Sequence, residues 1–175
     1  MDKLRRTAIF GAIAGLSGLL TLSKTQAKQV DNAKMVIDRA EIIDAVNIIG
    51  LGGDLRDWKL CRAAFADKVL TDYTSLNGGT PNTTQADTLI AGWQYFFSKT
   101  FKTTQHMITN HAVKVNANTA TCTSHFQAHH VYLDGAKGSW TLGGYYNHTL
   151  ARINGSWKVT EMKMTWTWEQ GTRPG

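Results

Sequence analysis

The feature that most constrains the fold of this chain is a change of hydrophobic period near Thr103. After this residue the sequence is rich in Thr, Val, Tyr and Trp, which favour β-strands. Turn sequences interrupt it at 116–118, 134–138 and 154–155, which predicts four long strands joined by hairpins. Strands of this kind bury one face, so the preceding part of the chain is expected to cover the sheet.

Apolar residues before Thr103 recur at helical spacing. The first helix is predicted to begin at Asp38 as N-cap, with Glu41 three residues later, and to stop at the glycines of 50–53. Helices followed by an antiparallel meander indicate a single α+β domain with its helices on one face of the sheet. The other predicted elements are a short helix over 58–67, a strand over 69–75, a loop over 77–82 and a third helix capped by Thr84.

The N-terminal segment has the order of a secretory signal. Basic residues precede an apolar run over 8–22, and a small-residue pattern follows at 25–27. The run is shorter than the roughly 20 apolar residues that cross a membrane. We therefore expect a signal peptide over 1–27, an exported domain over 28–175 in the periplasm or outside the cell, and no stable membrane anchor after cleavage. An arginine pair leaves both the general and the twin-arginine export routes open.

Charge and motif content exclude several functional classes. Removal of residues 1–27 takes away four cations and one anion, so the formal charge falls from +6 to +3. The remaining cations are scattered, which argues against a nucleic-acid partner. Nucleotide-binding glycine loops and metal-ligand spacings are missing from the sequence, so no cofactor and no metal are expected. Cys61 and Cys122 fit two buried free thiols better than a disulfide, which the compartment would permit.

Strand alternation indicates which side chains point inward. His130 belongs to the more apolar face of the strand over 119–132 and is predicted to be covered, whereas the pattern around His106 does not settle its orientation. One face of the last strand is predicted to form core or a dimer interface, carrying Met162, Met164, Trp166 and Trp168. Taken singly, a strand histidine is more often structural than catalytic.

Several short segments, in order and spacing, resemble scytalone dehydratase of the SnoaL-like, or nuclear transport factor 2-like, superfamily. Residues 54–58 (DLRDW) resemble its DSKDW segment, and 104–108 (TQHMI) resemble its TQHFIG segment. Residues 72–73 match its pocket tyrosine, 154–159 resemble its closing hairpin, and the similarity extends over about 42–168. The resemblance implies a cystatin-like α+β barrel, in which a cone-shaped, mixed or antiparallel sheet and three helices enclose a pocket.

The resemblance also implies roles for individual residues. Asp54 and His106 match a catalytic dyad that is similar to that of hexachlorocyclohexane dehydrochlorinase, a relative that eliminates without metal. His130 matches a second histidine if one residue is deleted in the preceding hairpin. Gly53, Gly144 and Tyr146 depart from the dehydratase pattern, which puts that enzyme's own substrate in doubt. The implied catalytic residues are Asp54, His106, His130 and Tyr73, and the implied substrate-binding residues are Tyr146, Phe126 and Trp58.

The function implied is a cofactor-independent lyase that performs a dehydratase-like elimination on a small hydroxylated carbonyl or cyclic substrate. His106 would act as the base, oriented by Asp54, while Tyr73 and His130 hold a water or substrate oxygen. A ketosteroid isomerase or polyketide cyclase-type enzyme is a first alternative, because both also begin by removing a proton beside a carbonyl. A non-catalytic exported module that binds an apolar small molecule is a second, and a homo-oligomer through the open sheet face is compatible with each.

Overall fold

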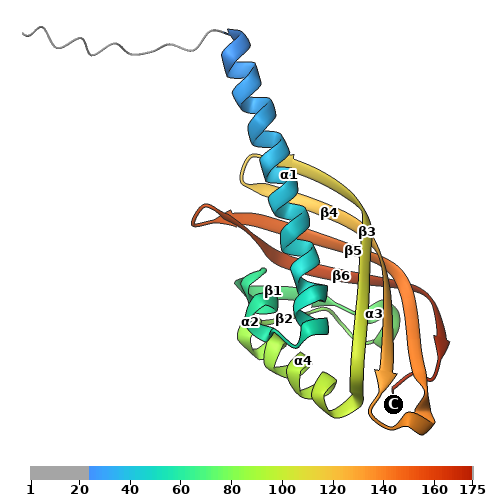
Figure 1. The fold of residues 1–175 in the computed structure, drawn as a ribbon. Helices are drawn as coiled ribbons and strands as arrows, with labels where there is room; N and C mark the ends of the chain where they lie inside the picture. Colours follow the sequence, from blue (N-terminus) through green and yellow to red (C-terminus); the bar gives the residue numbers. More distant parts are fainter. Residues whose placement is uncertain (1–23, 175) are drawn as a thin grey trace, which may run out of the picture.

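The computed structural model describes residues 24–174 and shows one sheet crossed by a long helix (Figure 1). The six strands have the order β2-β1-β6-β5-β4-β3, and all pairs are antiparallel except β1 with β6. The helices are α1 (Lys24–Leu55), α2 (Trp58–Ala63), α3 (Thr74–Asn77), α4 (Ala86–Thr100) and the 3-10 turn η1 (Gly135–Lys137). The strands are β1 (Phe65–Asp72), β2 (Asn82–Gln85), β3 (Phe101–Asn116), β4 (Thr119–Tyr132), β5 (Ser139–Ile153) and β6 (Ser156–Gly171).

The predicted α+β class and the curved mixed sheet are confirmed. Strands β3 to β6 are the four long strands expected from the sequence, and they curve beside α1, with α2 and α4 near one end (Figure 1). The sheet stays open, with β2 and β3 at its edges. Ile42 and Val46 of α1 are fully buried in the core between the helix and the sheet. Cys61 and Cys122 are buried free thiols, as favoured by the sequence.

The predicted signal sequence lies outside the described residues except for 24–27, which begin α1. Cleavage near residue 27 therefore stays a prediction. Within the described range, no helix combines the length and apolar character that a membrane crossing requires.

Helix α1 is longer at its start than predicted. Asp38 is not its N-cap but an interior residue, only 4% exposed. Its carboxylate pairs with Lys34 at 2.6 Å and with Arg152 of β5. A charge is tolerated at this depth because both of its partners are cations.

The end of α1 also differs from the prediction, because the glycines of 50–53 do not stop the helix, and Gly50 and Gly52 are sites of close packing. A Cβ atom at Gly50 would lie 3.0 Å from the Cβ of His106, and one at Gly52 would lie 2.7 Å from the backbone nitrogen of Cys61. The helix ends only where Arg56 adopts a left-handed conformation with φ of 59°. Asp54 therefore lies in the last turn of α1, not beyond it.

The short elements between α1 and β3 were placed only approximately by the sequence. Helix α2 is capped by the Asp57 carboxylate, which accepts a hydrogen bond from the Leu60 N–H at 2.9 Å, and it ends before β1. Tyr73 follows β1 as the N-cap of α3 and is not a strand residue. Thr84 pairs with Val69 inside the edge strand β2 and does not cap α4. Residues 82–85 form a strand because they pair with β1, although the composition of this segment is typical of a loop.

Breaks in strand register influence which side chains face the core. Strand β4 alternates as predicted, with His130 buried. In β3 a bulge near Asn110, whose φ is 56°, shifts the register, so His106 faces inward before it and Val113 faces inward after it. In β6 a register shift opposite Gly143 turns Trp168 to the outer face. The prediction that Trp168 shares a face with the buried methionines is therefore wrong.

Candidate active site

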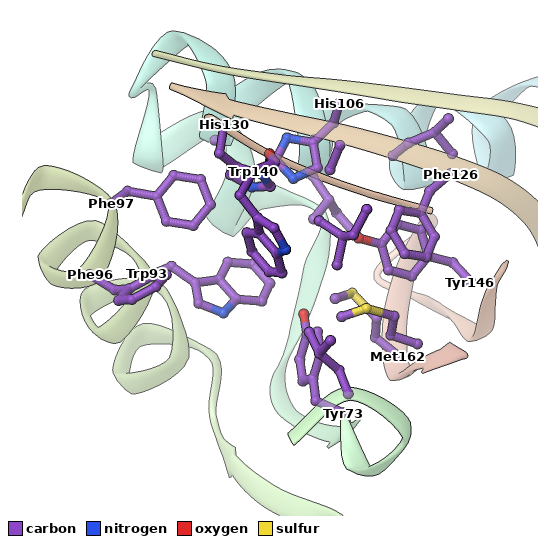
Figure 2. Close-up of a pocket in the computed structure, with 18 of the residues that line it drawn as sticks. Tyr73, Trp93, Phe96, Phe97, His106, Phe126, His130, Trp140, Tyr146 and Met162 are labelled. Carbon is purple, nitrogen blue, oxygen red and sulfur yellow. Dashed lines mark hydrogen bonds between the residues drawn. The ribbon is translucent and has the colours of Figure 1, made fainter. Parts of the chain in front are cut away.

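A cavity of about 460 Å³ lies between the sheet and the helices (Figure 2). Aromatic rings make up much of its wall, and few polar groups enter it. Six of the seven site residues expected from the sequence line it: Trp58, Tyr73, His106, Phe126, His130 and Tyr146. Asp54 is the seventh and contacts His106 at the wall.

Asp54 and His106 form a hydrogen-bonded pair between the end of α1 and strand β3. Asp54 Oδ1 lies 2.7 Å from Nδ1 of the imidazole, and Oδ2 accepts the backbone N–H of His106 at 2.6 Å. Because a carboxylate only accepts, Nδ1 carries a proton, and in the neutral form of the ring Nε2 therefore holds the lone pair. The side chains are 14% and 13% exposed, respectively, so bulk water screens the pair only in part.

Two residues that the sequence did not single out support the dyad. The Thr104 hydroxyl donates to Asp54 Oδ1 at 2.8 Å, and Arg56 donates to the same hydroxyl oxygen at 2.9 Å. Burial raises the pKa of the Asp54 carboxyl group, but the hydrogen bonds and charge of His106 and the hydrogen bond of Thr104 outweigh it, and the pKa lies below its ordinary value. Asp54 is therefore an anion at neutral pH. Thr104 belongs to the TQHMI segment, which could have indicated it.

His130 lies beside the dyad on the neighbouring strand β4, with its ring centroid 5.5 Å from that of His106. Its Nδ1 donates to the Trp140 carbonyl oxygen at 3.2 Å, and the Phe101 ring lies 4.6 Å away. Burial, followed by the charge of His106, lowers the pKa of His130 to about 4. The ring is thus neutral at neutral pH and presents Nε2 as a hydrogen-bond acceptor.

Two tyrosine hydroxyl groups point into the cavity (Figure 2). Tyr73 enters from the N-terminus of α3, and Tyr146 comes from β5, stacked on Phe126 with a centroid distance of 4.2 Å. Burial raises the pKa of both phenols above the ordinary value. Both therefore remain protonated and are available as hydrogen-bond donors.

The sequence missed much of the cavity wall. Trp93, Phe96 and Phe97 of α4 were predicted only as an apolar helix stripe, and Trp140 and His148 of β5 were not singled out. The helical spacing found the apolar face of α4 but could not show that the face borders a cavity.

The two glycines that depart from the dehydratase pattern have different consequences. Gly53 lines the cavity, and a Cβ atom there would meet nothing within 4 Å, so the missing side chain leaves room. A Cβ at Gly144 would lie 2.0 Å from the Thr165 carbonyl oxygen, so the bulged backbone leaves no space for a side chain. The pocket is therefore open beside Gly53, whereas Gly144 is not part of the cavity lining and is required by the close approach of β6.

Acid is expected to destabilise the protein through two buried histidines. Burial is the main cause that lowers the pKa of His130 to about 4 and of His148 to about 3, against 6.5 when unperturbed. Below pH 6.5 the unfolded chain binds protons that the folded chain does not, so stability falls with pH until these folded values are reached. The expected slope is up to about 1.4 kcal/mol per pH unit for each histidine.

Urea unfolding between pH 7 and pH 4 measures this slope. The variant His148→Leu is expected to flatten it, whereas replacement of the exposed His125 by Gln is expected to leave it unchanged. An equal slope in wild type and His148→Leu would contradict the assignment.

Comparisons with known proteins agree with the fold. The SnoaL-like domain family matches residues 34–163. The Kfla4162 protein from Kribbella flavida is 26% identical, with a TM-score of 0.74 over 78% of this chain and 95% of its own. A scytalone dehydratase-like protein from Novosphingobium aromaticivorans is 18% identical, with a TM-score of 0.67 over 85% and 93% of the two chains.

A hexachlorocyclohexane dehydrochlorinase, LinA-type3 from Novosphingobium barchaimii, is 16% identical, with a TM-score of 0.66 over 81% of this chain and 94% of its own. No curated protein matches the sequence significantly. The family match covers most of the chain, including both members of the Asp54–His106 pair. The chain belongs to the SnoaL-like domain family.

Proposed function

We propose that this protein is a cofactor-independent lyase that eliminates water or another small leaving group from a carbonyl or cyclic compound. The observation that carries the proposal is the 2.7 Å contact between Asp54 Oδ1 and His106 Nδ1 at the cavity wall. It gives His106 a fixed tautomer whose Nε2 is a base. Dehydratase-like and dehydrochlorinase structures among the similar folds support this reaction type.

The proposed reaction starts when Nε2 of His106 removes a proton from a carbon beside a carbonyl group. The C–H electron pair forms the new carbon–carbon double bond as the leaving group departs with its own bonding pair. Asp54 stabilises the imidazolium ion that results. When the leaving group is hydroxide, the imidazolium returns its proton to give water, so the histidine is neutral again after each turnover.

The developing negative charge on the carbonyl oxygen needs hydrogen-bond donors. The hydroxyl groups of Tyr73 and Tyr146 point into the cavity and can supply them (Figure 2). His130 has a different role, because its Nδ1 proton is already donated to the Trp140 carbonyl oxygen. Its Nε2 can accept a hydrogen bond from a substrate hydroxyl or a water molecule.

Isomerisation is the second candidate, because it shares the first proton transfer and differs only in where the proton returns. Ketosteroid-type isomerases commonly use a carboxylate base. Among the described residues, the cavity lining contains no Asp or Glu, and this favours a histidine base for either reaction.

A substrate panel tests the proposal. The purified protein is incubated with β-hydroxy ketones and with β,γ-unsaturated ketones, and the absorbance of the conjugated product is followed. We expect conversion of β-hydroxy ketones. Conversion of β,γ-unsaturated ketones alone would replace the lyase by an isomerase. Binding without any conversion, detected through the fluorescence of the cavity tryptophans, would indicate a binding module and contradict the proposal.

A further inference from the structure

His148 is a buried polar residue that the proposed reaction does not use. It lies on β5, lines the cavity and is 2% exposed. Its Nδ1 is buried and has no hydrogen-bond partner within residues 24–174. The other two histidines of the wall are held differently, since His106 bonds to Asp54 and His130 bonds to the Trp140 carbonyl.

An unpaired polar group in the interior is costly, because it loses water and gains nothing in exchange. An apolar residue of similar size at position 148 would avoid this cost. A ligand in the cavity cannot reach Nδ1, which protein atoms enclose, but it can reach Nε2, the ring nitrogen that is not enclosed and that also has no partner among the described residues. A hydrogen bond to Nε2 would give this buried imidazole its one polar partner, so the place of His148 in the cavity wall points to a contact made when the cavity is occupied.

The position of His148 separates it from the reacting groups. Along β5, Trp140 pairs with His130 of β4, whereas His148 pairs with Cys122 of the same strand. Tyr146 lies between them on the inward face, and its ring centroid is 5.6 Å from that of His148. A compound whose reacting carbon lies beside His106 would meet His148 with a more remote part of its structure.

The charge state of His148 indicates which chemical group the remote part of the ligand carries. Burial is the main cause that lowers the pKa of His148 to about 3, and the charge of His111 adds to it. At neutral pH the ring is uncharged, with one N–H donor and one acceptor nitrogen. This suits a neutral hydroxyl group, which both donates and accepts, better than a carboxylate.

We propose that His148 is a substrate-positioning residue that binds a hydroxyl group remote from the reacting carbonyl of an uncharged substrate. The inference rests on the proposed function for the position of the reacting end. The hydroxyl preference itself is a property of binding, so it can be measured without turnover.

Two pairs of ketones without leaving groups test the proposal. Acetophenone is compared with 4-hydroxyacetophenone, and 4-acetylbiphenyl with 4-acetyl-4′-hydroxybiphenyl, which places the hydroxyl at two distances from the carbonyl. Binding is measured by quenching of tryptophan fluorescence, since Trp58, Trp93 and Trp140 line the cavity. Wild type is expected to bind the hydroxylated member of at least one pair about ten-fold more tightly, the size of one buried hydrogen bond.

The variant His148→Leu is expected to lose this preference and to bind the unhydroxylated member as wild type does. Met162→Leu, a change at the strand neighbour of His148, is the control and should keep the preference. His106→Ala should keep it too, so a failure of the catalytic proposal is distinguishable from a failure of this one. Absence of the preference in wild type for both pairs, or its persistence in His148→Leu, would overturn the inference.

Discussion

Replacement of His106 by Ala is expected to lower kcat/KM by about a hundred- to ten-thousand-fold, which is the contribution of general acid–base catalysis by one positioned side chain. The reason is that the other groups of the described cavity wall are poor bases. Burial lowers the pKa of His130 to about 4 and that of His148 to about 3, so both are weakly basic, and the tyrosines are protonated.

The fold should survive this change. The side chain of His106 borders the cavity, and its backbone N–H still donates to Asp54. Steady-state kinetics and thermal unfolding are measured together, with His125→Ala on the outer face of β4 as the histidine control. A variant that is folded and within ten-fold of wild-type activity would exclude His106 as the base.

Replacement of Asp54 by Asn is expected to lower kcat by about a hundred- to ten-thousand-fold with little change in KM. Asn has the same shape, but its neutral amide does not stabilise the imidazolium ion and can also donate to Nδ1, which would favour the wrong tautomer. KM should change little because Asp54 lies behind His106 and is not part of the cavity lining.

The control for this variant is Asp57→Asn. Asp57 is a nearby exposed carboxylate that caps α2 and makes no contact with the dyad in the structure. Because Asn caps helices about as well as Asp, the Asp57→Asn variant should keep its stability and leave kcat unchanged. A raised KM with unchanged kcat in Asp54→Asn would instead identify Asp54 as a binding group.

The sequence predicted the inward side of β4 and therefore the burial of His130, because alternation holds along the whole strand. It did not orient His106, because the bulge at Asn110 changes which residues of β3 face the core. A bulge adds one residue locally and leaves no clear mark in composition. The same physical reason explains the error at Trp168.

Contacts between distant segments were the other limit of sequence reasoning. Gly50 and Gly52 have the composition of a helix stop, but they are required because α1 lies against His106 and α2. The Arg56 and Thr104 support of Asp54 and the unpaired His148 arise only when α1, β3 and β5 are brought together. The resemblance identified Asp54 and His106 as a pair, and the structure shows the distance and orientation between them.

The central claim, that His106 is a base acting on carbon, is tested most directly by hydrogen exchange at a carbon acid. 4-Acetylbiphenyl has no leaving group, so exchange of its methyl hydrogens for deuterium in D₂O reports proton removal alone and can be followed by NMR. We expect wild type to accelerate the exchange and His106→Ala to show the rate of buffer. Exchange at the buffer rate with wild type, or equal acceleration by both proteins, would contradict the account.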